Sequence, residues 1–149
     1  MFKALAAAAA LAASLATPAA AQGAEGAPEL VITEAGTQVL GDFLWQSRLL
    51  VVFADSPNDP RFIQQMGYIE DRPGDLIERD VIVITDTDPA ARSPIREELR
   101  PRGFDFVLIG KDGFKYLRKP LPWDVREISR SIDKMPLRQQ ELRDQRARP

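Results

Sequence analysis

The chain contains no cysteine and no histidine. Without cysteine it can form no disulfide bond, no thiolate nucleophile and no thiolate metal site. Without histidine it lacks the side chain that most often acts as an acid or base near neutral pH, which is also the commonest metal ligand. Few enzyme mechanisms survive both absences, and thiol-based redox chemistry is not one of them.

The chain also has little excess of either charge, since its 149 residues carry a net charge of −2 at neutral pH. A charge this small does not steer a protein toward nucleic acid or another strongly charged partner. The length is enough for one domain with its own hydrophobic core. Apolar residues make up 44% of the chain, but many are N-terminal alanines, so the core must come from residues after Val31.

Residues 1–21 have the three parts of a secretory signal peptide. Lys3 supplies a positive charge, residues 4–16 are apolar apart from one serine, and Ala21 ends a run of small residues. We expect cleavage after Ala21, a flexible lead over residues 22–29, and a mature protein exported to the periplasm or the extracellular space. The apolar run is shorter than the roughly 20 residues that a membrane span needs, so no span is expected after cleavage.

Two short apolar runs predict buried strands at the centre of a sheet. Leu49–Phe53 and Val81–Ile84 are apolar at every position, which is typical of strands buried on both faces. Between them, Asp59-Pro60 predicts a helix start, because aspartate caps free amides and proline suits the first helical position. The inward stripe of that helix is expected to be Phe62, Ile63, Met66 and Ile69. A helix between two such strands forms a right-handed βαβ unit.

The remaining elements complete an α/β pattern. We expect an edge strand at Leu30–Ile32, a helix from Ser93-Pro94, a strand at Phe104–Ile109, an antiparallel return after the turn Gly110–Gly113, and a last helix with an inward stripe of Val125, Ile128, Ile132 and Met135. Asp-Gly in the turn is a strong hairpin signal. This order is typical of a thioredoxin-like fold, with a central mixed sheet of two parallel strands plus an antiparallel hairpin and helices on both faces. We place this domain at residues 30–137 and a charged extension at residues 138–149.

Four stretches carry a family resemblance: Arg48–Ala54, Glu78–Asp80, Leu108–Gly113 and Ile132–Arg138. In this order and separation they resemble the DUDES domain family, whose function is unknown. Its members include bacterial secreted proteins, and relatives lie inside animal extracellular-matrix proteins of the sushi-repeat and coiled-coil type. The resemblance covers about residues 43–143 and implies a thioredoxin-like fold similar to peroxiredoxins, with no established reaction. The adhesion or matrix roles of the animal relatives need not transfer to a single small domain.

Polar residues follow two predicted strands at the place where thioredoxin-like enzymes carry a reactive cysteine. The candidate binding residues in these loops are Asp55, Ser56, Asn58, Asp59, Asp86 and Asp88. Converging carboxylates suit a hard cation such as calcium or magnesium, but the spacing is not that of an EF-hand, and aspartate is common in turns and helix caps. The favoured interpretation is therefore a loop that turns the chain and caps a helix, and no catalytic residue, metal or cofactor is assigned.

Other conspicuous residues have ordinary structural interpretations. The stretch Gly110–Gly113 lacks the spacing and the Lys-Ser/Thr ending of a phosphate loop, so a hairpin turn is favoured. Trp45 and Trp123 are interpreted as core or edge packing. The arginines near the C-terminus alternate with acids and are interpreted as a solvated face; they are Arg138, Arg143, Arg146 and Arg148.

Two functions remain open. The first is an exported thioredoxin-like module without redox cysteines that binds a protein or an envelope component of unknown identity. The alternative is an enzyme that uses carboxylates, Ser56 or a bound metal in the loop after the central strand. The enzyme hypothesis is favoured if Asp55, Ser56, Asp59 and Asp86 line one concave pocket into which Arg79, Arg102 or Lys111 points. A flat or convex loop end favours the binding module.

Overall fold

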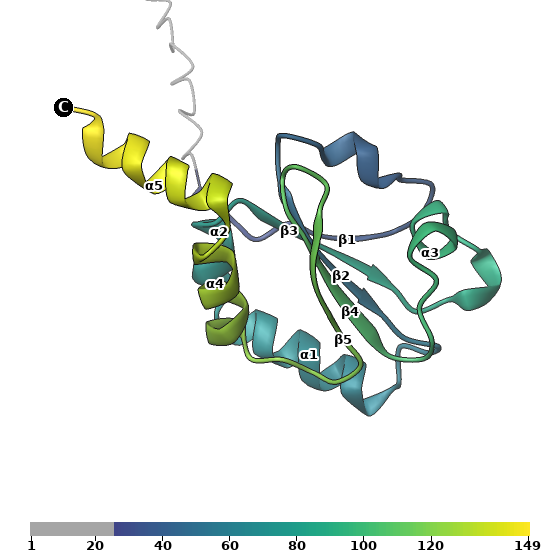
Figure 1. The fold of residues 1–149 in the computed structure, drawn as a ribbon. Helices are drawn as coiled ribbons and strands as arrows, with labels where there is room; N and C mark the ends of the chain where they lie inside the picture. Colours follow the sequence, from purple (N-terminus) through teal and green to yellow (C-terminus); the bar gives the residue numbers. More distant parts are fainter. Residues whose placement is uncertain (1–25) are drawn as a thin grey trace, which may run out of the picture.

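The computed structural model describes residues 26–149; the predicted signal peptide and the first residues of the flexible lead lie outside this range. Within it, one five-stranded mixed sheet forms the centre of the domain, in the strand order β1-β3-β2-β4-β5 (Figure 1). The strands are β1 (Ile32–Glu34), β2 (Arg48–Phe53), β3 (Val81–Asp86), β4 (Asp105–Ile109) and β5 (Lys115–Lys119). β1, β3 and β2 run parallel, whereas β4 and β5 are each antiparallel to their neighbours. The predicted mixed sheet is confirmed. The expected edge strand is also present as β1, a third parallel strand, but it begins at Ile32, two residues later than predicted.

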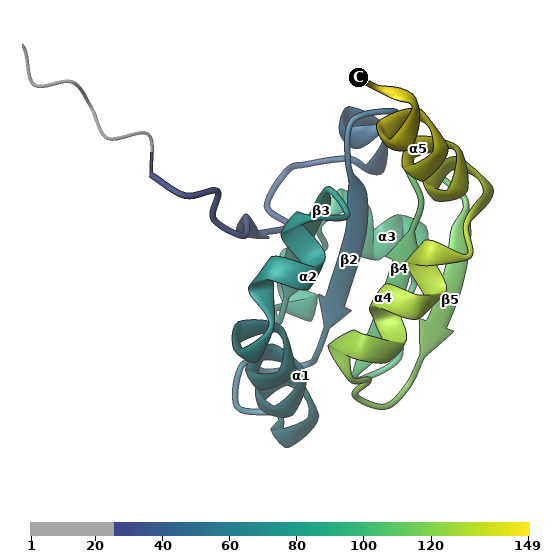
Figure 2. The same ribbon diagram turned by 90° about the vertical axis from the view of Figure 1, so that its left-hand side faces the viewer.

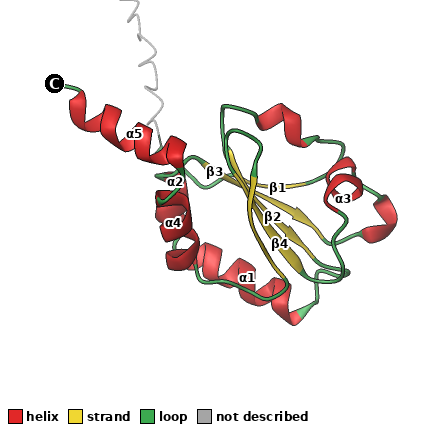
Figure 3. Ribbon diagram, viewed as in Figure 1, coloured by secondary structure: helices red, strands yellow, loops and turns green. Residues whose placement is uncertain are grey.

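Within residues 26–149, five α-helices and two 3₁₀ turns surround the sheet (Figure 3). They are α1 (Pro60–Asp71), α2 (Pro73–Ile77), α3 (Pro94–Leu99), α4 (Val125–Asp133), α5 (Pro136–Ala147), η1 (Leu40–Phe43) and η2 (Pro89–Ala91). Two predicted helix starts are confirmed by their caps. The Asp59 carboxylate accepts a hydrogen bond from the Arg61 amide at 2.9 Å, and the Ser93 hydroxyl accepts one from the Arg96 amide at 3.1 Å. No helix in the described range is long and apolar enough to cross a membrane.

β2 is buried along its whole length. Its side chains alternate between two hydrophobic clusters: Leu50 and Val52 belong to one face of the sheet, and Leu49, Val51 and Phe53 belong to the other. The strand lies between β3 and β4, so both of its edges are paired. A polar side chain in this run would be buried without a partner whichever way it pointed, which explains the unbroken apolar sequence.

The two faces of the sheet are covered unequally (Figures 1 and 2). One face packs against α1, α2 and α4, which contribute Ile69, Leu76 and Ile128, among others, to its cluster. The other face is covered by α3, which has 6 residues, and by η1, which has 4. These short elements contribute side chains such as Ile95 and Phe43. The second face is therefore covered by much less helix than the first.

One position of the predicted stripe on α1 is wrong. Ile63 is 57% exposed, whereas Gln65 is fully buried. The Gln65 side-chain amide pairs with the backbone of Trp123 on both sides: Nε2 donates to the carbonyl oxygen at 3.0 Å, and Oε1 accepts from the amide at 2.8 Å. Because both groups of the amide are satisfied, a polar side chain can occupy a buried position that an apolar pattern does not detect.

The two tryptophans occupy different environments. Trp123 packs against the core as predicted, with its ring 6.2 Å from that of Phe106. Trp45 is 69% exposed, so its predicted packing is wrong. The physical reason lies in the backbone, since Trp45 has a φ of +63° and its amide donates to the Lys111 carbonyl at 2.7 Å. The chain therefore turns into β2 at this residue and leaves the indole in solvent.

The C-terminal helical region is interrupted at Met135. α4 ends at Asp133 and α5 begins at Pro136, because proline lacks the amide that a continuing helix needs and suits a first turn. α5 projects beyond the sheet (Figure 1), and its last residues, including three of the C-terminal arginines, are exposed as predicted. Arg138 is only 2% exposed, so its assignment to a solvated face is wrong. The first turn of α5 packs on the domain and brings Arg138 to Asp133 and Glu141.

Candidate functional site

The carboxyl ends of β2 and β3 meet as the sequence predicts, with Phe53 beside Asp86 in the parallel register. The candidate residues of the two following loops nevertheless line two separate hollows. The first, of about 480 Å³, is open and is lined by Asp55, Ser56, Asn58 and Asp59 with the start of α1. The second, of about 170 Å³, is lined by Asp86 and Asp88 with residues around the end of β1. The sequence therefore locates the loops correctly, but their polar groups do not converge in one pocket.

Two polar side chains of the loop after β2, Asp59 and Ser56, form hydrogen bonds with groups next to them in the chain. The Arg61 guanidinium donates to the Asp59 carboxylate at 3.1 Å, and this hydrogen bond lowers the pKa of Asp59. The Ser56 hydroxyl accepts a hydrogen bond from the Asn58 backbone amide at 3.1 Å, and it forms no other side-chain hydrogen bond within residues 26–149. An amide is not a base that could activate the hydroxyl. Asp59 therefore caps a helix and Ser56 shapes a turn, in agreement with the favoured interpretation of this loop.

Asp86 is buried in a structural ion pair. Its carboxylate accepts hydrogen bonds from the Ser93 hydroxyl at 2.5 Å and from the Arg96 guanidinium at 2.9 Å. Burial alone would raise the pKa of Asp86, but the hydrogen bonds from Arg96 and Ser93 outweigh it and the pKa is lowered. Arg96 also donates to the Ala54 carbonyl at 3.0 Å. This arrangement ties the ends of β2 and β3 to α3, and it leaves Asp86 ionised and fully occupied.

The three cations that would favour the enzyme hypothesis point elsewhere, and the cation that lines the first hollow is Arg61. Arg79 pairs with Asp133, Lys111 pairs with Asp80, and Arg102 lines a different hollow beside β5. Among the described residues there is also no group of three or more acidic side chains placed to hold a metal ion. The single pocket with one of these three cations pointing in, which would favour the enzyme hypothesis, is therefore not formed.

A group of charges with two buried arginines at its centre lies at the opposite end of the sheet, around the start of β2. We call it the ion network; its members are Arg48, Glu78, Arg79, Asp80, Lys111, Asp133, Arg138 and Glu141. Cations and anions are equal in number, and the side chains of Arg48 and Arg138 are 1% and 2% exposed. Seven of the eight residues fall in the four stretches that carry the family resemblance. Those stretches therefore meet away from the loop that sequence reasoning selected.

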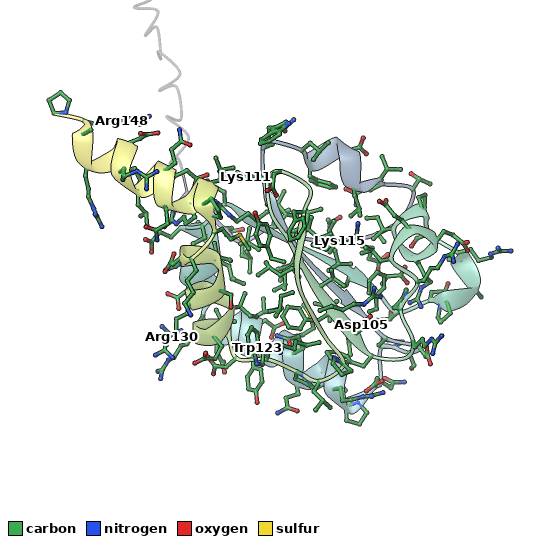
Figure 4. All side chains as sticks on the ribbon, viewed as in Figure 1. Asp105, Lys111, Lys115, Trp123, Arg130 and Arg148 are labelled. Carbon is green, nitrogen blue, oxygen red and sulfur yellow. The ribbon has the colours of Figure 1, made fainter. Side chains whose placement is uncertain are left out.

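Glu141 joins the start of β2 to the hairpin turn. Its carboxylate accepts hydrogen bonds from the Arg48 guanidinium at 3.1 Å and from the Lys111 ammonium at 2.8 Å. Lys111 also donates to Asp80 at 2.8 Å, and Arg48 also donates to the Arg79 carbonyl at 2.9 Å. Figure 4 places Lys111 between the turn of the β4–β5 hairpin and the base of α5. One carboxylate on α5 thus joins the start of β2 to the turn of the β4–β5 hairpin.

Asp133 fastens α4 to the segment before β3. The Arg79 guanidinium donates to both of its carboxylate oxygens, at 2.9 and 2.8 Å, which is the strong bidentate geometry. Arg138 donates to the same carboxylate at 3.4 Å and lies 3.6 Å from Glu141, so it links the two halves of the network. Sequence reasoning missed this group because its members are scattered along the chain. The available signal was a charged residue at the boundary of an apolar run, such as Arg48.

Acid should destabilise the protein through this network. Hydrogen bonding from Arg79 lowers the pKa of Asp133. Burial raises the pKa of Glu141, but the hydrogen bond from Lys111 and the charge of Arg48 outweigh it, so this pKa is lowered too. Both carboxylates bind protons less tightly in the folded state. Their stabilising contribution is therefore complete above the unfolded pKa values of about 4 and is lost as the pH falls through the folded ones.

We expect the free energy of unfolding, measured by urea titration with circular dichroism, to fall as the pH is lowered below about 4. A Glu141→Gln variant should lose less stability over the same interval, because one of the titrating carboxylates is absent. An identical pH profile for the variant and the native chain would contradict the role of Glu141.

Exposed apolar side chains flank η1 and follow the hairpin turn beside the network. We call Val39, Leu44, Trp45 and Phe114 the aromatic surface; they are 44%, 40%, 69% and 62% exposed. The surface joins the end of η1 to the hairpin turn, since the Trp45 amide bonds to Lys111. A positive φ is a strained conformation for a bulky residue, and such strain persists only where the surrounding structure enforces it. The contacts of Lys111 provide that enforcement here.

Comparison with solved structures identifies the fold as thioredoxin-like. Reduced 2-Cys peroxiredoxin from Plasmodium vivax aligns with a TM-score of 0.53 and 14% identity, over 68% of this chain and 84% of that one. Reduced desulfothioredoxin from Desulfovibrio vulgaris Hildenborough gives 0.53 and 16%, over 72% of this chain and all of that one. Chloroplastic thioredoxin z gives 0.54 and 20%, over 74% of this chain and all of that one. The predicted thioredoxin-like fold is confirmed, and at these identities the likeness concerns the fold alone.

A comparison with curated proteins found no significant match. A family model matches residues 39–141, and its description is a domain of unknown function, DUF4174. The match runs from η1 to the start of α5 and contains all eight residues of the ion network, including Glu141. The resemblance to the DUDES family stays a prediction. Because the matched residues make up well over half of the sequence, this chain belongs to the DUF4174 family of domains of unknown function.

Proposed function

We propose that the mature chain is an exported, non-redox thioredoxin-like domain that binds a protein partner through the aromatic surface. The observation that carries the proposal is Trp45, a tryptophan 69% exposed and held at a φ of +63°. Tryptophan is enriched among the residues that dominate binding energy at interfaces. A large apolar side chain kept in solvent by a strained backbone is therefore better explained by a partner than by folding.

The aromatic surface is also rigidly supported. The Lys111 carbonyl accepts a hydrogen bond from the Trp45 amide at 2.7 Å, while the Lys111 ammonium forms ion pairs with Asp80 and Glu141. On the hairpin, the Phe114 ring packs edge-on against Tyr116 with centroids 4.8 Å apart. Side chains that are already ordered lose less conformational entropy on binding. The ion network thus supports the geometry of the surface rather than catalysis.

Photocrosslinking in the producing cell tests this proposal. Benzoyl-phenylalanine is introduced at Trp45, at Phe114 and, as a matched control, at Ile63. Ile63 is 57% exposed but lies on α1, after the other end of β2. A discrete crosslinked protein from positions 45 and 114, absent from position 63, is the expected result. Equal labelling from all three positions, or labelling from position 63 alone, would contradict the proposal.

Export is tested by the mass of the recovered protein. If residues 1–21 are a signal peptide, protein recovered from the extracytoplasmic fraction should begin at Gln22. Intact-mass spectrometry distinguishes this form from the full chain without ambiguity. A mass that still includes residues 1–21 would refute cleavage after Ala21.

Thiol-dependent turnover should be absent. Disulfide reduction and thiol peroxidase reactions pass through a thiolate, a sulfenic acid or a mixed disulfide, and each of these needs cysteine sulfur. We expect no insulin reduction with dithiothreitol and no peroxide consumption with a thiol donor above the uncatalysed rate. A thioredoxin assayed in parallel provides the positive control. Turnover that disappears on Ser56→Ala or Asp59→Ala would overturn the prediction and restore the enzyme hypothesis.

A further inference from the structure

A hollow of about 310 Å³ opens next to the aromatic surface, over the less covered face of the sheet. Apolar side chains form much of its lining; they are Leu40, Phe43, Leu44, Leu49 and Ile109. Leu49 and Ile109 are directly opposite each other on β2 and β4, whereas the others come from η1 and the residue after it. The volume is at the lower end of the roughly 300–1,000 Å³ typical of ligand pockets.

Close packing of the hairpin turn fixes one wall of this hollow. A Cβ atom on Gly110 would lie 2.5 Å from the Tyr116 ring, and one on Gly113 would lie 2.8 Å from the Leu44 side chain. Gly113 also has a φ of +80°, which other residues rarely adopt. The turn therefore approaches Leu44 more closely than any residue with a side chain would allow, and the hollow is formed before a partner arrives.

The charged residues of the lining are all acidic. They are Glu98 on α3 and Asp112 in the hairpin turn, and no lysine or arginine lines the hollow. Within residues 26–149 neither acid forms an ion pair, although the neighbouring Glu97 pairs with Arg92 at 2.9 Å. The Asp112 carboxylate accepts from the Phe114 amide and the Tyr116 hydroxyl, which are neutral groups. An apolar hollow with uncompensated negative charge is complementary to an apolar group that lies next to a cation.

We infer that this hollow receives a large apolar side chain of a partner protein, from a segment in which a lysine or arginine lies next to that side chain. The inference rests on the proposed function, because Leu44 belongs both to the hollow and to the aromatic surface, so one partner would cover both. The apolar side chain would pack against Leu44 and the partly buried Leu40 and Phe43, above the floor that Leu49 and Ile109 form. The adjacent cation would neutralise Glu98 or Asp112.

Model peptides test the chemistry of the occupant. Three seven-residue peptides share serine and glycine ends and carry Lys-Leu-Lys, Glu-Leu-Glu or Lys-Ser-Lys at the centre. Binding to the ¹⁵N-labelled full chain is followed by NMR shifts of the Gly41, Gly110 and Gly113 amides. The Lys-Leu-Lys peptide should shift the resonances of these amides. It should also bind at least about tenfold more tightly than the Lys-Ser-Lys peptide, because binding removes the apolar surface of the leucine from water. Equal binding of the acidic and basic leucine peptides would overturn the inference.

Two variants locate the contact. Gly41 lines the hollow, and a Cβ atom there meets nothing within 4 Å. Gly41→Leu therefore introduces a side chain without a clash at Cβ, and it should narrow the hollow and weaken binding of the Lys-Leu-Lys peptide about tenfold. Glu98→Gln should weaken it about threefold, as expected for one exposed charge pair. Glu97→Gln is the matched control and should leave the affinity unchanged. Full affinity in Gly41→Leu would place the peptide elsewhere and refute the inference.

The crosslinking result separates this inference from the proposed function. A partner that crosslinks to position 45 with undiminished yield in the Gly41→Leu background would leave the proposed function intact and refute the hollow as its contact. Loss of the crosslink in that background, together with the peptide preference, supports both. Absence of any crosslink at positions 45 and 114, with peptide binding at the hollow retained, would refute the proposed function and leave the peptide site.

Discussion

Replacing Val52 or Val83 by aspartate should prevent the chain from folding into a soluble, cooperative domain. Both side chains are fully buried on neighbouring parallel strands, where the predicted burial is confirmed. An aspartate there would bury a charge or a protonated carboxyl without a partner, at a cost of several kcal/mol. This cost is comparable to the whole free energy of unfolding of an ordinary domain, about 5–15 kcal/mol. The expected readouts are insoluble protein or the loss of a cooperative urea transition.

A matched substitution on the surface separates burial from a general effect of charge. Leu121 is 63% exposed, so Leu121→Asp should change the free energy of unfolding by less than about 0.5 kcal/mol. Soluble and cooperatively folding Val52→Asp or Val83→Asp protein would show that β2 and β3 are not the central strands.

Neutralising Glu141 should produce the second largest loss of stability. Glu141→Gln keeps the shape of the side chain but leaves Arg48 and Arg138, which are 1% and 2% exposed, with one anion fewer. Removing one partner of a buried ion pair costs about 3–5 kcal/mol. We expect a value near the lower limit, about 3 kcal/mol, because Glu141 is itself 20% exposed and solvent screens part of the charge. Urea unfolding of the two proteins at neutral pH measures the difference.

The same helix supplies the control. Asp144 is an exposed acid one turn after Glu141, so Asp144→Asn removes the same charge from α5 and should cost less than about 0.5 kcal/mol. The double variant Arg48→Met with Glu141→Leu should recover much of the stability, since apolar replacements can substitute for a buried ion pair. Equal losses for Glu141→Gln and Asp144→Asn would show that the network does not fasten α5.

Local signals predicted most of the fold. The run Leu49–Phe53 specifies a central strand because both faces must be apolar, and this information lies within the strand itself. The cap of α1 by Asp59 and the cap of α3 by Ser93 depend on neighbours two or three residues away. The Asp-Gly turn before β5 is equally local. Patterns of this kind can be recognised in the sequence because they do not depend on residues that are distant along the chain.

The candidate site was predicted less well. The order of strands and helices placed the loops after β2 and β3 side by side, as they are. It could not show that Asp86 turns inward to Ser93 and Arg96, while Asp59 turns back to Arg61. Each carboxylate is bound by groups near it in the sequence, so the two loops keep separate hollows. The direction of a side chain depends on local packing that a residue pattern does not encode.

The sequence by itself determined the absence of thiol chemistry, the order of strands and helices, and the burial of β2, because each depends on composition or on residues within one element. Only the tertiary structure decided which charges meet and which apolar groups stay exposed. Arg48 and Glu141 are 93 residues apart, and Trp45 is exposed because a hairpin residue, Lys111, holds its backbone. Such contacts depend on which distant segments pack together. Many pairings of charges are compatible with one sequence, and the packed sheet selects one of them.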